Sequence, residues 1–218
     1  MSEGGSRGDV AMRVIAKVHR PGVTPEEMAA GYDEWSENYE EMMIWKGGYR
    51  GPAITLEEAL RWVPPERRAK ARVLDVAAGT GCVGRELHRE GFRHIDAVDP
   101  SEGMMKQRET GIYTNDFLEF IGSGHSTVPK GGFVIIVMRH EFLQTVPSYK
   151  DKLEPYMDQL EADGKWKKVE RRIVPNYFCD KEGLVFVFRI TKPESLHQCP
   201  RRNAEDCIKS RPRPGKPH

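Results

Sequence analysis

The chain has 218 residues, of which 38% are hydrophobic and 31% charged, and its mean hydropathy is −0.63. Lys and Arg number 34 against 33 Asp and Glu, so the net charge of +1 creates no overall field that would attract nucleic acid or an acidic membrane. The longest apolar run, 133–138, is far shorter than the ~20 residues of a membrane span, and the first ten residues lack the apolar core of a signal peptide. We therefore expect a cytoplasmic protein that is neither membrane-bound, secreted nor wholly disordered.

The distribution of charge and proline divides the chain. The segment 193–218 contains 6 Lys and Arg against 3 Asp and Glu, together with 5 of the 15 prolines. This composition offers little to bury and predicts a disordered basic tail. Residues 1–192 carry 28 basic against 30 acidic side chains, a net charge of −2. Within them we expect an N-terminal segment, 1–23, and one folded domain, 24–192.

The first part of the chain is predicted to be helical. Residues 10–18 have the pattern of a short helix that ends before Pro21. Thr24 is a good N-cap for the next helix, Pro25 suits its first position, and Glu27 completes a capping box. That helix is expected to run to about Glu37. An amphipathic helix at 56–62 follows and is stopped by two prolines.

The middle of the chain has the order of a βαβ unit. Residues 71–76 read as a buried strand, 77–81 as a tight turn of small residues, and 83–89 as a helix. A second strand, 94–98, ends in an aspartate, and a short helix is expected at 104–108. This order predicts a parallel sheet.

The last part of the domain adds one strong strand, one helix and a strand pair. Residues 132–138 are almost wholly apolar, and 148–162 have apolar residues at helical spacing. Residues 168–178 and 184–190 are predicted to form an antiparallel pair with a turn between them. The expected fold class is α/β, with the final strand antiparallel.

The turn after the first strand is the main candidate for a binding site. Gly79 and Gly81 permit backbone dihedrals that other residues resist, and the helix that follows directs free N–H groups at a ligand. Asp99 lies 20 residues after Gly79, at the end of the next strand, where a carboxylate can accept hydrogen bonds from two ribose hydroxyls. The combination predicts a nucleoside ligand at the carboxyl edge of the sheet.

Two cofactors are compatible with a glycine turn and a strand-end acid. Gly79-x-Gly81-x-x-Gly84 matches the dinucleotide pattern literally, so an NAD-dependent oxidoreductase is one alternative. Asp75, however, stands inside the strand, and V-L-D-x-x-x-G-T-G resembles motif I of class I S-adenosylmethionine-dependent methyltransferases. This resemblance extends over residues 25–191 and implies a Rossmann-like sheet with helices on both faces. It favours S-adenosylmethionine as cofactor and S-adenosylhomocysteine as product.

The resemblance also implies which residues hold the cofactor. Its methionine part is expected to lie against Asp75, Ala77, Gly79 and Gly81. Asp99 is expected to hold the ribose, and Met104 matches an apolar patch near the adenine. Ala77 replaces the more usual glycine, which is tolerated if its φ is negative and otherwise costs about 1 kcal/mol.

A second stretch that resembles the family is Y-D-E-W-S-E-N-Y, residues 32–39. In such enzymes this stretch belongs to a helical lid over the cofactor, which here would span 24–62. Trp35 and Tyr39 are then expected to close the lid. The alternative is that these two aromatic side chains only pack the helices together.

The chain departs from the family between Asp99 and the P-K-G-G turn at 129–132, where only 29 residues intervene. The usual fourth strand, which neighbours the first, and its helix are missing. Three alternatives remain open. In the first, residues 116–121 act as a replacement strand. In the second, the strand 132–138 pairs directly with the first strand. In the third, the chain is an internally shortened isoform or gene model that folds poorly. An unpaired strand in the centre of a sheet leaves backbone groups without hydrogen bonds.

The implied reaction is methyl transfer to an unidentified acceptor, for which we expect a small molecule and no specific nucleic acid. Catalytic residues stay unassigned, and weak candidates for a base are Tyr39, His125 and Glu141. The other hypothesis is a cofactor-binding or interaction protein without catalysis. The four cysteines are scattered and lack metal-ligand spacing, so we expect reduced thiols and no metal site. These cysteines are Cys82, Cys179, Cys199 and Cys207.

Overall fold

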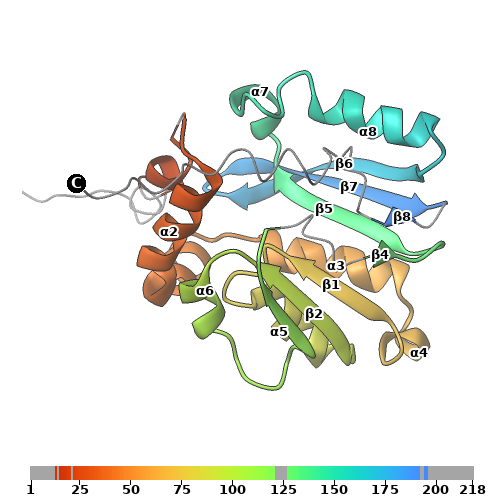
Figure 1. The fold of residues 1–218 in the computed structure, drawn as a ribbon, viewed down its shortest axis with the longest axis horizontal. Helices are drawn as coiled ribbons and strands as arrows, with labels where there is room; N and C mark the ends of the chain where they lie inside the picture. The colour runs from red at the N-terminus through yellow and green to blue at the C-terminus, as the bar shows by residue number, and fades with distance from the viewer. Residues whose placement is uncertain (1–12, 14, 21, 121–126, 192–193, 196–218) are drawn as a thin grey trace, which may run out of the picture.

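The computed structural model describes residues 13, 15–20, 22–120, 127–191 and 194–195. Residues 15–18 form a helical turn, within the predicted first helix. The later helices are α2 (Pro25–Trp35), η1 (Ser36–Asn38), η2 (Glu41–Lys46), α3 (Gly51–Trp62), α4 (Pro65–Arg68), α5 (Cys82–Arg89), α6 (Glu102–Lys106), α7 (Phe142–Thr145) and α8 (Leu153–Ala162). The strands are β1 (Arg72–Val76), β2 (His94–Asp99), β3 (Asn115–Leu118), β4 (Thr127–Val128), β5 (Phe133–Arg139), β6 (Trp166–Phe178), β7 (Lys181–Ile190) and β8 (Glu194–Ser195). Figure 1 shows their arrangement.

The N-terminal helices begin as predicted but continue further. The Thr24 hydroxyl accepts a hydrogen bond from the Glu27 backbone N–H at 3.1 Å, and the Thr24 N–H donates to the Glu27 carboxylate at 3.0 Å, so the capping box is confirmed. Helix α2 ends at Trp35 rather than near Glu37, and the chain goes on into the 3-10 helix η1 and the π-helix η2. Helix α3 starts five residues before the predicted 56, because Pro52 occupies its first turn without loss of a bond.

The strands form two half-sheets. Strands β1, β2 and β3 are parallel and lie in the order β1-β2-β3, which confirms the predicted βαβ unit. Strands β5, β7 and β6 are antiparallel and lie in the order β5-β7-β6, which confirms the predicted final pair. A further antiparallel contact joins β4 to β8.

The structure contradicts two of the three alternatives for the missing strand. Strand β3 uses part of the predicted replacement segment, but it pairs with the far side of β2 and does not neighbour β1. Strand β5 pairs with β7, and no pairing between β5 and β1 occurs among the described residues. Both expectations for the open edge of β1 are therefore wrong. Side-chain packing takes the place of a ladder there, since Ile135 of β5 contacts the same cluster as Val73 of β1.

Strand β7 is the centre of the hydrophobic core. Its residues Leu184 to Phe188 are all fully buried, and they alternate between two clusters. Leu184, Phe186 and Phe188 pack with Leu143 of α7 and Met157 of α8 on one face. Helices of residues 24–62 cover the other face of the antiparallel half-sheet, so helices lie on both of its faces, as predicted.

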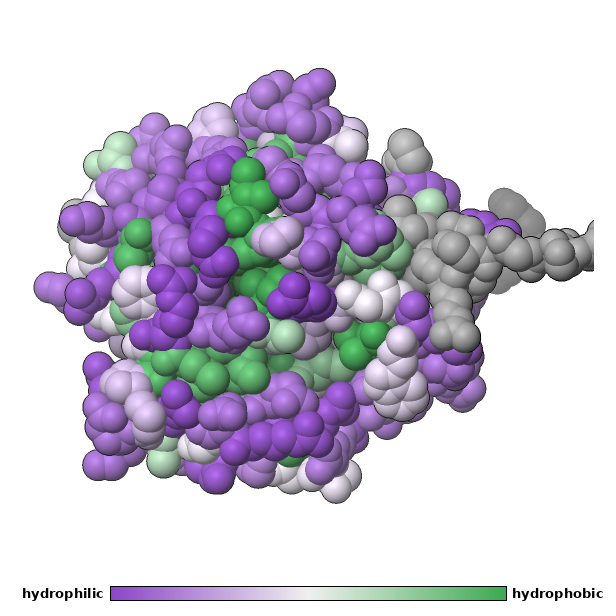
Figure 2. All heavy atoms as spheres, turned by 180° about the vertical axis from the view of Figure 1, so that it is seen from behind, coloured by the Kyte–Doolittle hydropathy of each residue, from purple (hydrophilic) through white to green (hydrophobic). Residues whose placement is uncertain are grey.

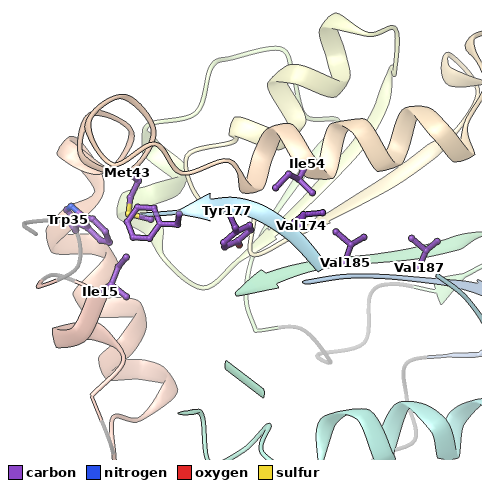
Figure 3. Close-up of a cluster of buried hydrophobic side chains, with 9 residues drawn as sticks. Ile15, Trp35, Met43, Ile54, Val174, Tyr177, Val185 and Val187 are labelled. Carbon is purple, nitrogen blue, oxygen red and sulfur yellow. The ribbon is translucent and has the colours of Figure 1, made fainter. Parts of the chain in front are cut away.

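That other face is covered by the helices of residues 24–62, which include α3. Figure 3 shows Val185 and Val187 beside Ile54 of α3 and, toward the lid, Tyr177 of β6 followed by Trp35. A smaller third cluster, centred on Leu87, Phe92 and Ile95, lies under the parallel half-sheet. From behind, hydrophobic side chains gather in a band between two polar parts of the surface (Figure 2).

Other boundaries differ locally from the predictions. Helix α8 begins at Leu153 rather than at 148, and the β6–β7 turn is centred on Cys179 and Asp180, both with positive φ. Glu194 and Ser195, placed in the predicted tail, pair with β4 as strand β8, and most of that tail lies outside the described residues. Within the described parts, no helix combines the length and the hydrophobicity that a membrane crossing requires.

Candidate cofactor site

The glycine turn between β1 and α5 has the backbone that its composition suggested. Gly79 and Gly81 adopt φ values of 54° and 83°, in the left-handed region. Ala77 also has a positive φ, 55°, so the condition under which alanine is tolerated freely is not met and a strain of about 1 kcal/mol is expected. The Gly81 N–H donates to the Ala78 carbonyl at 2.8 Å and closes the turn immediately before α5.

Asp99 lies at the carboxyl end of β2, beside this turn. Its side chain is buried, and its two oxygens accept hydrogen bonds from the backbone N–H groups of Gly79 and Ser101, each at 2.8 Å. The structure thus brings together Asp99 and Gly79, two residues that the sequence placed 20 positions apart. A carboxylate has about four lone-pair positions, so two remain for other donors.

Asp75 is buried in β1 and has a partner that the sequence did not indicate. The Tyr113 hydroxyl, from the loop before β3, donates to its carboxylate at 2.8 Å. Burial raises the pKa of Asp75 to about 6, although the Tyr113 bond and Arg108 oppose the change and Asp99 adds to it. A positive charge close to this carboxyl would lower its pKa and favour the ionised form.

Arg108 connects the glycine turn to strand β3 by hydrogen bonds. Its guanidinium donates to the Gly79 carbonyl at 2.8 Å and to the Asp116 carboxylate of β3 at 2.5 Å, and it lies 5.0 Å from the centre of the Tyr113 ring. Its Nη2 is buried and has no hydrogen-bond partner among the residues that the structure describes. Gly84 is required here, because a Cβ would lie 2.3 Å from the Tyr113 hydroxyl. Sequence reasoning missed Arg108 and Tyr113, since no local motif marks them.

The remaining predicted cofactor residues lie on α6 and the lid. Met104 is buried on α6, just after Asp99. Trp35 is also buried, its indole N–H lies 3.1 Å from the Met42 sulfur, and it belongs to the main core cluster. The ring centre of Tyr39 is 5.1 Å from that of Trp35. The structure therefore gives both aromatic residues a packing role, while their predicted role at the cofactor stays a prediction.

The three candidate bases fare differently. Burial raises the pKa of Tyr39 well above its ordinary value, so its phenol stays protonated. The Glu141 carboxylate is 3.3 Å from Arg139 and 3.1 Å from Lys181, which hold it as an ion-pair partner. His125 lies outside the described residues. A histidine that the sequence did not mark, His19, lies with Nε2 3.0 Å from the Tyr32 hydroxyl of α2, and burial lowers its pKa.

The geometry fits the nucleoside cofactor that the motif implies. A Cβ placed on Gly79 would have only the Ala77 carbonyl near it, at 4.0 Å, so one side of the turn is open. Asp99 has lone pairs left for ribose hydroxyls, and Asp75 offers a carboxyl to an ammonium group. Among the described residues, no group of three His, Cys, Asp or Glu converges in the way a metal ion would need.

The known proteins that are similar to this chain include methyltransferases. No protein-family model matches the chain. Human methyltransferase-like protein 27 is 30% identical over 194 residues, which cover 76% of this chain and 78% of that protein. A Burkholderia thailandensis 1,6-didemethyltoxoflavin-N1-methyltransferase, whose structure contains S-adenosylhomocysteine, is 17% identical with a TM-score of 0.52, over 79% of this chain and 92% of that one.

Fold and site together define a Rossmann-like, S-adenosylmethionine-dependent methyltransferase, and the NAD-dependent alternative is set aside. The 30% identity over 76% of the chain also shows the family. The chain belongs to the family of methyltransferase-like protein 27.

Proposed function

We propose that this protein binds S-adenosylmethionine at the β1–α5 turn and transfers its methyl group to a small-molecule acceptor. The observation that supports it most is the Asp99 carboxylate, buried at the end of β2 and bonded to the Gly79 N–H at 2.8 Å. This bond sets the strand-end acid and the glycine turn at one edge of the parallel half-sheet, where ligands of open α/β sheets bind.

Each residue of the site has a separate task in this proposal. Asp99 accepts hydrogen bonds from the two ribose hydroxyls, and Gly79 and Gly81 let the backbone approach the methionine part. Asp75 pairs with the ammonium group, and Met104 lies against the adenine. When bound, the cofactor supplies an electrophilic methyl carbon, so the protein needs mainly to orient the acceptor and to exclude water.

The acceptor is inferred from the lid. Residues 24–62 include α2, η1, η2 and α3. Their aromatic side chains pack into or against the main core cluster, except for Trp45, which is 75% exposed. The net charge of +1 creates no overall field that would attract a polyanion. Both features favour a small molecule as acceptor.

Isothermal titration with S-adenosylmethionine and S-adenosylhomocysteine tests the cofactor assignment. Asp99→Asn removes one charged acceptor, and we expect a loss of roughly 10- to 100-fold in affinity. Asp96→Asn is the matched control, because it makes the same charge change on the same strand, where Asp96 bonds to Asn115 at 2.8 Å. Folded wild-type protein that binds neither ligand would contradict the proposal.

A second candidate function follows from the split sheet. Because β5 and β1 do not pair among the described residues, the wall between cofactor and acceptor differs from that of a continuous sheet. This observation favours a protein that binds the cofactor without turnover. Intact binding together with no methyl transfer across a broad panel of small acceptors would support this alternative.

A further inference from the structure

Asp33, a residue of the lid helix α2, contacts residues 100–103, which follow Asp99 at the junction of β2 and α6 and are called the Asp99 loop below. Its carboxylate oxygen Oδ1 accepts two hydrogen bonds, from the Ser101 hydroxyl at 2.6 Å and from the Gly103 backbone N–H at 2.7 Å. Both donors lie 68 or more positions further along the chain. No other polar side chain of α2 bonds to this loop in the described residues, so Asp33 is the polar link between lid and loop there.

The loop side of this contact is buried and hydrogen-bonded. Ser101 is fully buried, and its hydroxyl also accepts a bond from the Met104 N–H at 3.2 Å, which caps α6. Its own backbone N–H donates to Asp99 Oδ1 at 2.8 Å. A continuous chain of hydrogen bonds therefore runs from Asp33 through Ser101 to Asp99.

Shape reinforces these bonds. A Cβ on Gly103 would lie 2.9 Å from the Asp33 Cα and 3.0 Å from the Ser36 hydroxyl, so α6 and α2 approach each other more closely than a larger residue allows. The Ser36 hydroxyl donates to the Asp33 carbonyl at 2.8 Å and holds this end of the helix. The contact is thus built from both elements.

We propose that Asp33 is a positioning residue of the cofactor site, which fixes the lid on the Asp99 loop and thereby holds Asp99 in place for the ribose. This inference rests on the proposed function, because it assigns Asp99 to the ribose. Asp33 acts through Ser101, so its loss changes how well the site distinguishes the ribose hydroxyls.

Hydrogen–deuterium exchange of the ligand-free protein tests the contact itself. Asp33→Asn is expected to increase exchange in both 25–38 and 99–108, since an amide accepts these bonds more weakly than a carboxylate. Gly103→Ala is expected to do the same from the other side, although alanine favours helix formation. Glu34→Gln is the matched control, because Glu34 is the next residue and its ion pair with Lys17 is exposed. Unchanged exchange in Asp33→Asn would overturn the proposal.

Ligand affinity tests the positioning role. Asp33→Asn is expected to weaken binding of S-adenosylhomocysteine by roughly 10-fold but binding of its 2′-deoxy analogue by much less. The dissociation constant of the analogue divided by that of S-adenosylhomocysteine therefore falls. A merely stabilising role predicts an equal loss for both ligands, and that result would overturn the proposal while leaving the proposed function intact. Failure of wild-type protein to bind either ligand would instead overturn the proposed function.

Discussion

The two half-sheets of this molecule divide stability and binding between them. The antiparallel half, β5-β7-β6, contains the five fully buried residues 184–188 and two of the three hydrophobic clusters. The parallel half, β1-β2-β3, carries Asp75 and Asp99. Its outer strand β3 is poorly covered, since Leu118 is 53% exposed. The difference teaches that most of the hydrophobic core lies on strands that contain no predicted cofactor residue.

The largest expected effect of a single change lies in the antiparallel half. Phe186→Ala removes a fully buried ring between β5 and α8 and is expected to lower the free energy of unfolding by about 4 kcal/mol, through lost burial and a cavity. Denaturant unfolding measures the change. Ile173→Ala on β6 is the control, because Ile173 is 42% exposed. Equal effects of the two variants would contradict the view that the buried side chains of β7 provide the stability of this half.

In the parallel half, the largest expected effect depends on pH. The pKa of Asp75 is about 6 in the folded chain against 3.8 for the ordinary carboxyl. The folded state therefore holds this proton more tightly, and the stability that results is complete below pH ~4 and is lost as pH rises through about 6. The loss corresponds to about 3 kcal/mol.

Asp75→Asn lacks this titration and serves as the comparison. The free energy of unfolding of wild-type protein, relative to that of the variant, is expected to fall between pH 4 and pH 7. Denaturant titrations at several pH values measure the difference. A constant difference over this range would show that Asp75 does not titrate as its burial implies.

A smaller effect is expected where a charge cluster ties α3 to β6. The Glu58 carboxylate is fully buried, is 2.7 Å from Arg61, and also pairs with Arg172 of β6. Arg172→Ala leaves that buried carboxylate with one arginine, and we expect a loss of about 1 to 2 kcal/mol, since Arg172 is partly exposed. Arg72→Ala, at an exposed pair with Asp96, is the control in thermal unfolding. Identical melting temperatures for the two variants would refute this role.

The smallest expected effect lies at the outer edge of the parallel half. Leu118→Ser changes a largely exposed side chain on β3 and is expected to alter the free energy of unfolding by less than about 0.5 kcal/mol. It is expected to reduce binding of a hydrophobic dye, because the exposed apolar area is smaller. Strong destabilisation would mean that β3 contributes to a core in the same way as β7.

Much of the fold was predictable because its signals are local. The capping box at Thr24 and the apolar runs of β5 and β7 each lie within a few residues, and each formed the expected element. The path of 115–118 was not predictable. Whether a short apolar segment joins the inner or the outer edge of a sheet depends on partners that are distant in the sequence.

The sequence by itself determined the glycine turn, the acid at the end of the next strand and the membership in a methyltransferase class, because these depend on short motifs with fixed spacing. Only the tertiary structure decided that Tyr113 bonds to Asp75, that Asp33 bonds to Ser101, and that the sheet divides between β1 and β5. The two hydrogen bonds join residues 38 or more positions apart. They depend on how distant segments pack in the folded chain and on the need of buried polar groups for partners, which no local motif records.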